Sequence, residues 1–355
     1  MSFRLRTSVV GLALALQFFA FDARSEPLRI FVSEFSGQGL LGQYVMTTLF
    51  LDLSESFKSL GSPEKGVWIL YGREPLRTDT HEEALLAATI PSIRADLAVW
   101  GKASSYGNGV VIQSYVSVTP LAAQREVRPE EWTLSGNIDG HPISLEIGLP
   151  HLFYDFEPFS LPNEVVEKYA SPAGLPLYKE RVGNDIVGYA KGAFSFDEIE
   201  ADSIRIRTDA GVVGWLHFTG LGQEHVQAND FTRALIRYMR GDWRGAAEAF
   251  EGLLARPDLP QAVRVDSLLY AGATEERLGE SGVSHFQAAY NLNPLDRSST
   301  QYLIMGTLNQ LLRQGRVTDD ERRSLTQLVR TAGILLPPDD PWLTSVRTVV
   351  GDHKP

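Results

Sequence analysis

The stretch that decides the fold is GDWRGAAEAF at residues 241–250, which is followed by Pro257. A second stretch of the same kind, FQAAYNLNP, occupies residues 286–294. Between the two, the phenylalanine repeats after 36 residues and the proline after 37. Repetition at this period is typical of helical hairpins that stack into a solenoid. The C-terminal part of the chain is therefore predicted to be an array of helix pairs.

Three helix pairs are expected in this part of the chain, with breaks at glycine-containing turns and ends at prolines. Both stretches resemble the second half of a tetratricopeptide (TPR) repeat, and the resemblance covers roughly residues 229–316. Recognition in such solenoids uses the concave surface lined by the first helices. The predicted pairs are Phe231–Met239 with Gly245–Leu254, Ala262–Leu278 with Val283–Leu292, and Ser298–Arg313 with Asp319–Ala332.

The first helices of these pairs carry our candidates for partner contacts. Trp243, Ala246, Phe250 and Phe286 are expected in the core of the array. The candidate residues on the concave surface are Arg233, Arg237, Tyr238 and Tyr270.

Before the array, short β-like runs separated by turns occupy residues 175–220, which is typical of a small barrel. The ending GVVGWL at residues 211–216 resembles that of bacterial SH3-like domains. This resemblance covers residues 174–220 and implies binding of peptides or cell-wall glycopeptide, or a role in assembly. Tyr178 and Trp215 are candidate residues of a binding groove because aromatic rings offer large contact areas. The alternative for Trp215 is a place in the small core of the barrel.

Residues 27–118 alternate between strand-like and helix-like patterns, which predicts a mixed α/β domain. A hairpin is expected around the turn Asp139-Gly140. The runs IFVSEF at residues 30–35 and ADLAVWG at 95–101 resemble the N-terminal α/β domain of TolB-like periplasmic proteins. That resemblance implies an interaction unit of an envelope complex rather than a catalyst.

The first residues read as a secretory signal peptide. Arg4 and Arg6 precede the apolar run Val9–Phe21, which is too short to span a bilayer as a helix. A small residue, Ser25, precedes the expected cleavage site before Glu26. The alternative is a buried first helix or an uncleaved anchor.

The amino-acid composition excludes several classes of function. The 355 residues include 33 Lys and Arg against 44 Asp and Glu, for a net charge of −11. Residues 1–25 hold three Arg and one Asp, so cleavage would leave −13. This charge argues against nucleic-acid binding. With no cysteine, the chain has no thiolate nucleophile, cysteine-ligated metal site or lipoprotein anchor. A periplasmic or secreted protein without stable membrane insertion is expected.

One glycine-rich loop offers a competing hypothesis. GQGLLG at residues 37–42 matches G-x-G-x-x-G between a predicted strand and a predicted helix, the context of a dinucleotide site. The expected acidic residue after the second strand is missing, since Glu74 comes 32 positions after Gly42. A tight β–α turn with close packing is therefore the favoured explanation of the glycines. The alternative function is therefore a nucleotide- or small-solute-binding protein or enzyme that uses the Gly37–Gly42 loop.

Other candidate chemistry has simple structural explanations. The seven histidines lack the spacing of a helical zinc pair. The acidic run at residues 197–202 is typical of a solvated loop. No G-x-S-x-G, P-loop or EF-hand pattern occurs in the sequence. A non-catalytic protein without cofactor or metal is expected, and an accessory to a cell-wall hydrolase is a further alternative.

Together these patterns predict a multi-domain α+β protein. We expect it to be an exported interaction or scaffold protein of the bacterial cell envelope. Its predicted partners are envelope proteins or peptides, with peptidoglycan as a further candidate. The predicted parts are a signal peptide (1–25), a TolB-like α/β domain (26–170), an SH3-like barrel (171–222), TPR-like helical repeats (229–335) and a tail (336–355).

Overall fold

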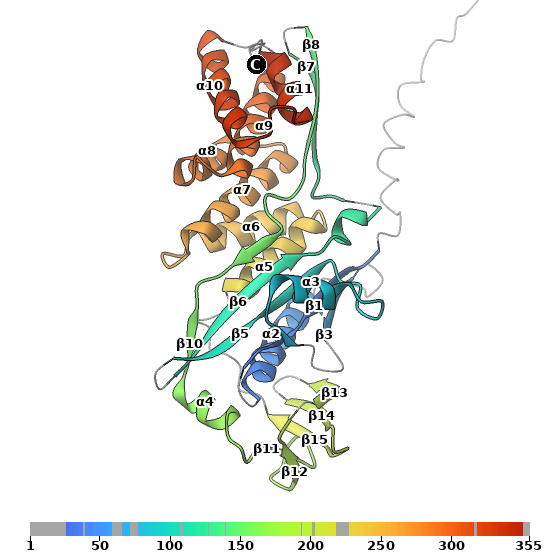
Figure 1. The fold of residues 1–355 in the computed structure, drawn as a ribbon. Coiled ribbons are helices and arrows are strands. Elements are labelled where there is room, and N and C mark those ends of the chain that lie inside the picture. Colours follow the sequence, from blue (N-terminus) through green and yellow to red (C-terminus); the bar gives the residue numbers. More distant parts are fainter. Residues whose placement is uncertain are drawn as a thin grey trace, which may run out of the picture.

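The computed structural model describes residues 26–37, 40–58, 66–71, 77–106, 109–126, 128–138, 140–192, 194–200, 203–217, 227–315 and 318–350. Over these ranges the chain forms β-sheets in its N-terminal and central parts and a helical region at the C-terminus (Figure 1). The predicted combination of α and β parts is thus confirmed at this level. The predicted signal peptide lies outside the described residues.

A six-stranded sheet forms the centre of the N-terminal part. Its strands are β1 (Leu28–Val32), β3 (Val67–Tyr71), β5 (Leu97–Tyr106), β6 (Gly109–Val118), β9 (Phe153–Asp155) and β10 (Phe159–Leu161). The order is β10-β6-β5-β1-β3, and β9 also pairs with β6. β1 is parallel to both β3 and β5, whereas β5 and β6 form an antiparallel hairpin.

Helices cover both faces of this sheet. Alternate residues of β1 point to opposite faces, as in any strand. Ile30 and Val32 share a core with α2 (Leu41–Lys58), while Phe31 packs with the alanines of α3 (His81–Thr89). The predicted mixed α/β arrangement is therefore present here. Its remaining short elements are β2 (Glu34–Phe35), β4 (Arg77–Thr78), the 3-10 turn η3 (Ala122–Gln124) and α4 (Asn163–Tyr169).

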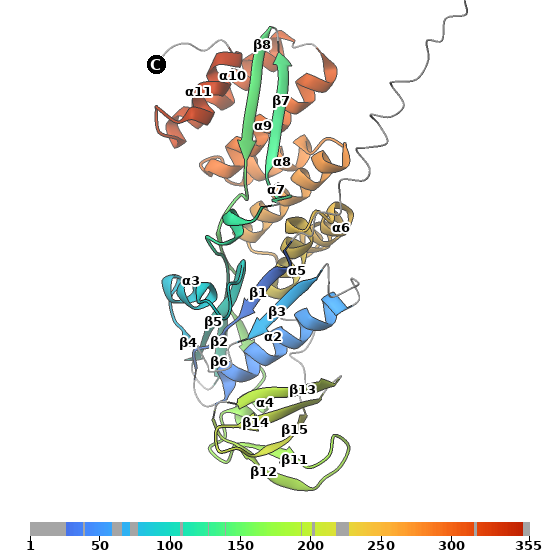
Figure 2. The ribbon, with the colours of Figure 1, turned by 90° about the vertical axis from the view of Figure 1, so that its right-hand side faces the viewer.

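Between β6 and β9 the chain leaves the sheet and forms the predicted hairpin. Its strands are β7 (Trp132–Ile138) and β8 (His141–Ile147). Gly140 has a φ of 86°, which favours glycine in the turn; Asp139 lies outside the described residues. Figure 2 shows the hairpin lying along α9 (Arg297–Gln314) of the helical region, away from the six-stranded sheet.

A five-stranded antiparallel sheet occupies the region of the predicted barrel. Its strands are β11 (Leu175–Tyr178), β12 (Ile186–Ala190), β13 (Phe194–Glu200), β14 (Ser203–Thr208) and β15 (Val213–His217). They lie in the order β12-β11-β15-β14-β13. Among the described strands no pairing joins β12 to β13, so the sheet stays open and no closed barrel is found.

The C-terminal region consists of helices packed in sequence. They are α5 (Gln227–Met239), α6 (Trp243–Leu254), α7 (Gln261–Leu278), α8 (Val283–Leu292), α9, α10 (Asp319–Leu335) and α11 (Pro341–Val350). Gly241, Gly279 and Gly315 follow α5, α7 and α9 with φ of 74°, 84° and 70°. Glycine adopts this conformation without a steric penalty, so each first helix ends and turns into the second. The three predicted helix pairs are therefore observed.

Residues 336–355 are predicted from the sequence to form a tail, but a further helix lies in this segment. Pro341 begins α11, where proline is tolerated because the first turn needs no amide donor. Leu343 and Val346 are fully buried in the common core. The segment 336–350 therefore completes the helical region instead of forming a tail.

Candidate functional site

The inner face of the helical array is occupied by the protein's own chain. The first helices α5, α7 and α9 contact β6, β9 and the β7–β8 hairpin. Trp132 stacks on Phe286 at 5.8 Å between ring centroids, and the ring of Tyr154 lies 4.7 Å from that of Phe231. All of these side chains are buried. The surface that the repeat resemblance assigns to a partner is thus an internal interface.

Residues 148–154 lie along this face in the manner of a bound peptide. The Tyr302 hydroxyl donates to the carbonyl of Gly148, and Ser298 Oγ donates to that of Pro150, both at 2.5 Å. The hydroxyls of Tyr154 and Tyr270 are 2.5 Å apart. Since buried carbonyls need donors, these bonds fix the segment on α7 and α9.

His151 is held between two carboxylates of the array. Its Nδ1 lies 2.6 Å from Asp266 Oδ1, and its Nε2 lies 3.1 Å from Asp296 Oδ1. Burial lowers the pKa of His151, but the hydrogen bonds and charges of the two aspartates outweigh it and raise the pKa to about 10. Both ring nitrogens then donate, and the imidazolium serves as a charged clamp.

The two aspartates respond differently to this contact. Burial raises the pKa of Asp266 above its usual value despite the nearby imidazolium. Burial also acts on Asp296, but hydrogen bonds from His151 and Ser299 bring its pKa below the usual value. The clamp therefore contains one carboxyl whose pKa is lowered, that of Asp296, and one whose pKa burial raises, that of Asp266.

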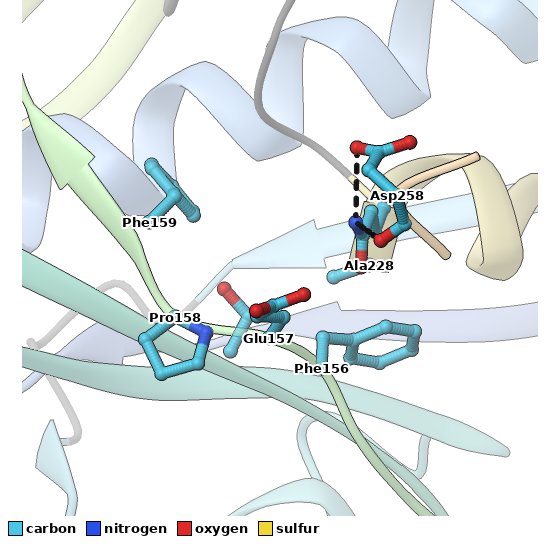
Figure 3. A pocket seen from close by; sticks show the side chains of 8 residues that line it. Phe156, Glu157, Pro158, Phe159, Ala228 and Asp258 are labelled. Atoms are coloured by element: carbon cyan, nitrogen blue, oxygen red, sulfur yellow. Dashed lines mark hydrogen bonds between the residues drawn. The ribbon is translucent and has the colours of Figure 1, made fainter. Parts of the chain in front are cut away.

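Two pockets lie where the segment meets the array. One of 430 Å³ is next to the clamp and includes Phe153, Asp155 and Gln261 in its lining. The other, of 240 Å³, lies between residues 156–159 and the start of α5, with Ala228 and Asp258 on its far side (Figure 3). Among the described residues, no three or more His, Asp or Glu side chains are grouped to hold a metal ion.

Of the four array residues predicted to contact a partner, two are buried and two bind other parts of the same chain. Tyr238 and Tyr270 are fully buried, so neither ring lies on an accessible concave surface. Arg233 is half-buried and paired with Asp52 and Asp230, and Arg237 donates to the carbonyl of Gly245 at 3.1 Å. These arginines connect elements of the protein itself.

The array residues predicted as core are mostly buried. Ala246, Phe250 and Phe286 have no exposed surface, and Trp243 is partly buried. Arg277 lies over the Trp243 ring at 5.4 Å, which explains why this indole remains near the surface.

The two predicted residues of the five-stranded sheet are brought together. Tyr178 on β11 pairs directly with Trp215 on β15, and both are half-buried. Directly paired residues point to the same face. The neighbouring Leu177 and Leu216 point to the opposite face and are buried in the core. Tyr178 and Trp215 therefore lie on the outer face of the sheet, with Arg205 next in the row.

The glycine-rich loop has a packing explanation at the positions that are described. A Cβ on Gly42 would lie 1.7 Å from the carbonyl oxygen of Phe35, so only glycine lets α2 approach β2. The N–H of Leu40 donates to the carbonyl of Tyr169 at 3.2 Å, which covers the start of α2. Gly39 and Glu74 lie outside the described residues.

Sequence reasoning missed His151 and Tyr154. Their hydrogen-bond partners in the array, Asp266 and Asp296 for His151 and Tyr270 for Tyr154, lie 115 or more residues away along the chain. No local spacing carries that information. The one available signal was the buried-looking sequence around Phe153, which alone does not indicate a contact with the array.

The chain matches no protein-family model, and no curated protein sequence matches it at a significant level. Among the helices that the structure describes, none has the length and apolar character required to cross a membrane.

Proposed function

We propose that this chain is a non-catalytic interaction protein of the bacterial cell envelope, which binds its partner through the outer face of the five-stranded sheet. One observation carries the proposal. Tyr178 and Trp215 lie side by side and partly exposed on that face, whereas the inner face of the array is filled. Clustered aromatic side chains with a charged neighbour are frequent anchors of protein interfaces.

Under this proposal the sheet is the SH3-like module and the array is the TPR-like module. The sequence endings around residues 211–216 and 241–250 support these two resemblances. The array then acts as a support that binds the segment 148–156 of the same chain. Partner recognition falls to the sheet, whose outer face extends from Ile186 through Tyr178 to Trp215.

The non-catalytic role is supported by the state of the clamp. A general base near neutral pH needs an imidazole nitrogen without a proton. Both nitrogens of His151 face carboxylates, and its pKa is raised to about 10. Export, which the first 25 residues suggest, would place the protein with envelope proteins and peptidoglycan.

The test is capture from envelope extracts and from isolated peptidoglycan with the purified protein as bait. Trp215→Ala and Tyr178→Ala should each reduce retention of the partner about tenfold or more, as expected of interface anchors. Tyr106→Ala is the matched control because Tyr106 is an aromatic residue 79% exposed on another sheet. Retention that is equal in all three variants would contradict the proposal.

A further inference from the structure

We propose that β12 is a self-association edge: it pairs antiparallel with β12 of a second copy of this chain and forms a twofold dimer. The inference is independent of the envelope role and of the partner surface proposed above. It rests on two observations. Of the two edge strands of the five-stranded sheet, β13 is contacted by other parts of the chain whereas β12 is exposed, and the residues in and next to β12 favour pairing.

The β13 edge is covered by the six-stranded sheet. The hydroxyl of Tyr71 on β3 accepts from the N–H of Phe196 at 3.1 Å and lies 3.3 Å from its carbonyl oxygen. The rings of Tyr71 and Phe196 are 4.2 Å apart, and Phe50 of α2 stacks on Phe196. This edge is therefore occupied at Phe196, in the first half of β13.

The β12 edge is exposed. β12 is the last strand in the sheet order and pairs only with β11 among the described residues. In both views it lies at the end of the molecule opposite to α10 (Figures 1 and 2). An exposed edge presents a row of backbone donors and acceptors that a further strand satisfies.

The side chains of β12 favour association over solvation. Ile186, Val187 and Tyr189 are 49%, 43% and 48% exposed, and Val182 in the preceding turn is 80% exposed. Proteins usually protect edges with lysine, proline or a bulge. The register shifts by one residue at Val187, but Ile186–Ala190 contains no charged residue and no proline. The bulge is therefore the sole protection within the strand.

The charges that flank β12 specify the occupant and its direction. Asp185 immediately precedes the strand and Lys191 immediately follows it, and both are exposed. An antiparallel pair of β12 strands places Asp185 of each copy beside Lys191 of the other, whereas a parallel pair opposes like charges. With Gly188 on the twofold axis, Val187 faces Tyr189, a favourable cross-strand combination. The strand is thus complementary to itself.

The experiment is sedimentation equilibrium of the purified protein at protein concentrations up to about 0.1 mM. Wild type should form a dimer. Val187→Lys should raise the dimer dissociation constant at least about tenfold, because a charge at the edge opposes pairing. The aliphatic part of lysine keeps the packing against the sheet. Circular dichroism and urea unfolding check that the variant folds.

A charge exchange tests the direction of pairing. Asp185→Lys opposes two lysines at each end and should weaken the dimer about tenfold. The double variant Asp185→Lys/Lys191→Asp restores opposite charges and should recover most of the affinity. Asp339→Lys is the control, since this substitution makes the same charge change at an exposed residue of the helical region.

Each outcome decides the proposal. A wild-type monomer at every concentration overturns it, as does a dimer that Val187→Lys leaves intact. A double variant as weak as Asp185→Lys rules out the antiparallel pairing. Loss of partner capture in Trp215→Ala without loss of the dimer separates this inference from the proposed function.

Discussion

In the structure the inner face of the helical array is covered by the chain itself, whereas the outer face of the five-stranded sheet is accessible. The sequence predicts two partner surfaces, the inner face of the helical array and a face of the β-rich region. The first is packed against residues 132–156 of the same chain, with Tyr238 and Tyr270 fully buried. The second leaves Tyr178 and Trp215 partly exposed next to each other. A repeat motif predicts the helices that form a groove, but it does not predict what fills the groove.

The difference also shows how each region should respond to substitution. Residues in a filled groove contribute to folding, so their removal costs stability. Residues on an open face contribute little to folding and can be selected for binding. The predictions below follow this contrast from the largest expected effect to the smallest.

The largest effect is expected from Tyr154→Ala. Tyr154 is 2% exposed, packs on Phe231 and hydrogen-bonds Tyr270, so truncation leaves a cavity and lost bonds. We expect the free energy of unfolding to fall by about 3–5 kcal/mol in urea titrations. Leu152→Ala, at a side chain 59% exposed two residues away, should change it by about 0.5 kcal/mol or less. Equal losses would mean that the segment does not pack on the array.

The second effect is a dependence of stability on pH. The folded pKa of His151, about 10, is higher than its ordinary value of 6.5. The clamp's contribution is therefore complete below pH 6.5 and is lost as pH rises toward 10. The slope from one proton is at most about 1.4 kcal/mol per pH unit. His151→Gln should remove this slope in urea titrations at pH 6, 8 and 9.5. A variant that keeps the wild-type slope would contradict the clamp.

A smaller loss is expected from Tyr270→Phe. The change deletes one hydroxyl that bonds Tyr154 and keeps the ring in place. The free energy of unfolding should fall by about 1 kcal/mol, the usual net value of one such bond. Partner capture should stay at the wild-type level, because the ring lies in the core. A fall in partner capture at an unchanged free energy of unfolding would show that Tyr270 contacts the partner.

The smallest effect on stability is expected on the sheet. Arg205→Gln removes an ion pair with Glu198 in which both side chains are nearly half-exposed, at 3.7 Å. Such pairs contribute about 0.5 kcal/mol or less. A change above 1.5 kcal/mol in the same urea titrations would show that the outer face is part of the folding core.

Much of the fold could be predicted from local patterns. The helix pairs follow from apolar periodicity and from the glycines that end each first helix at 241, 279 and 315. The β7–β8 hairpin follows from its turn and its alternating apolar residues. These features depend on residues that are close in sequence, which is why a single sequence contains them.

The contacts between distant segments could not be predicted in this way. The partners of His151 lie within α7 and at the N-cap of α9, 115 and 145 residues further along the chain. The helix that begins at Pro341 could not be predicted either. A proline fits the first turn of a helix as well as it ends a preceding one, so the sequence alone does not distinguish the two. For the site, the sequence placed Tyr178 and Trp215 correctly in one sheet, but it could not show that Tyr238 and Tyr270 are covered.

The His151 clamp holds residues 148–156 on the inner face of the array. Nitrogen NMR of the labelled histidines tests it most directly, with His151 assigned by comparison with His151→Gln. Both ring nitrogens of His151 should remain protonated at pH 8, and the ring should titrate at a pKa of about 10. A ring that titrates near 6.5, the value of a solvated histidine, would contradict the clamp.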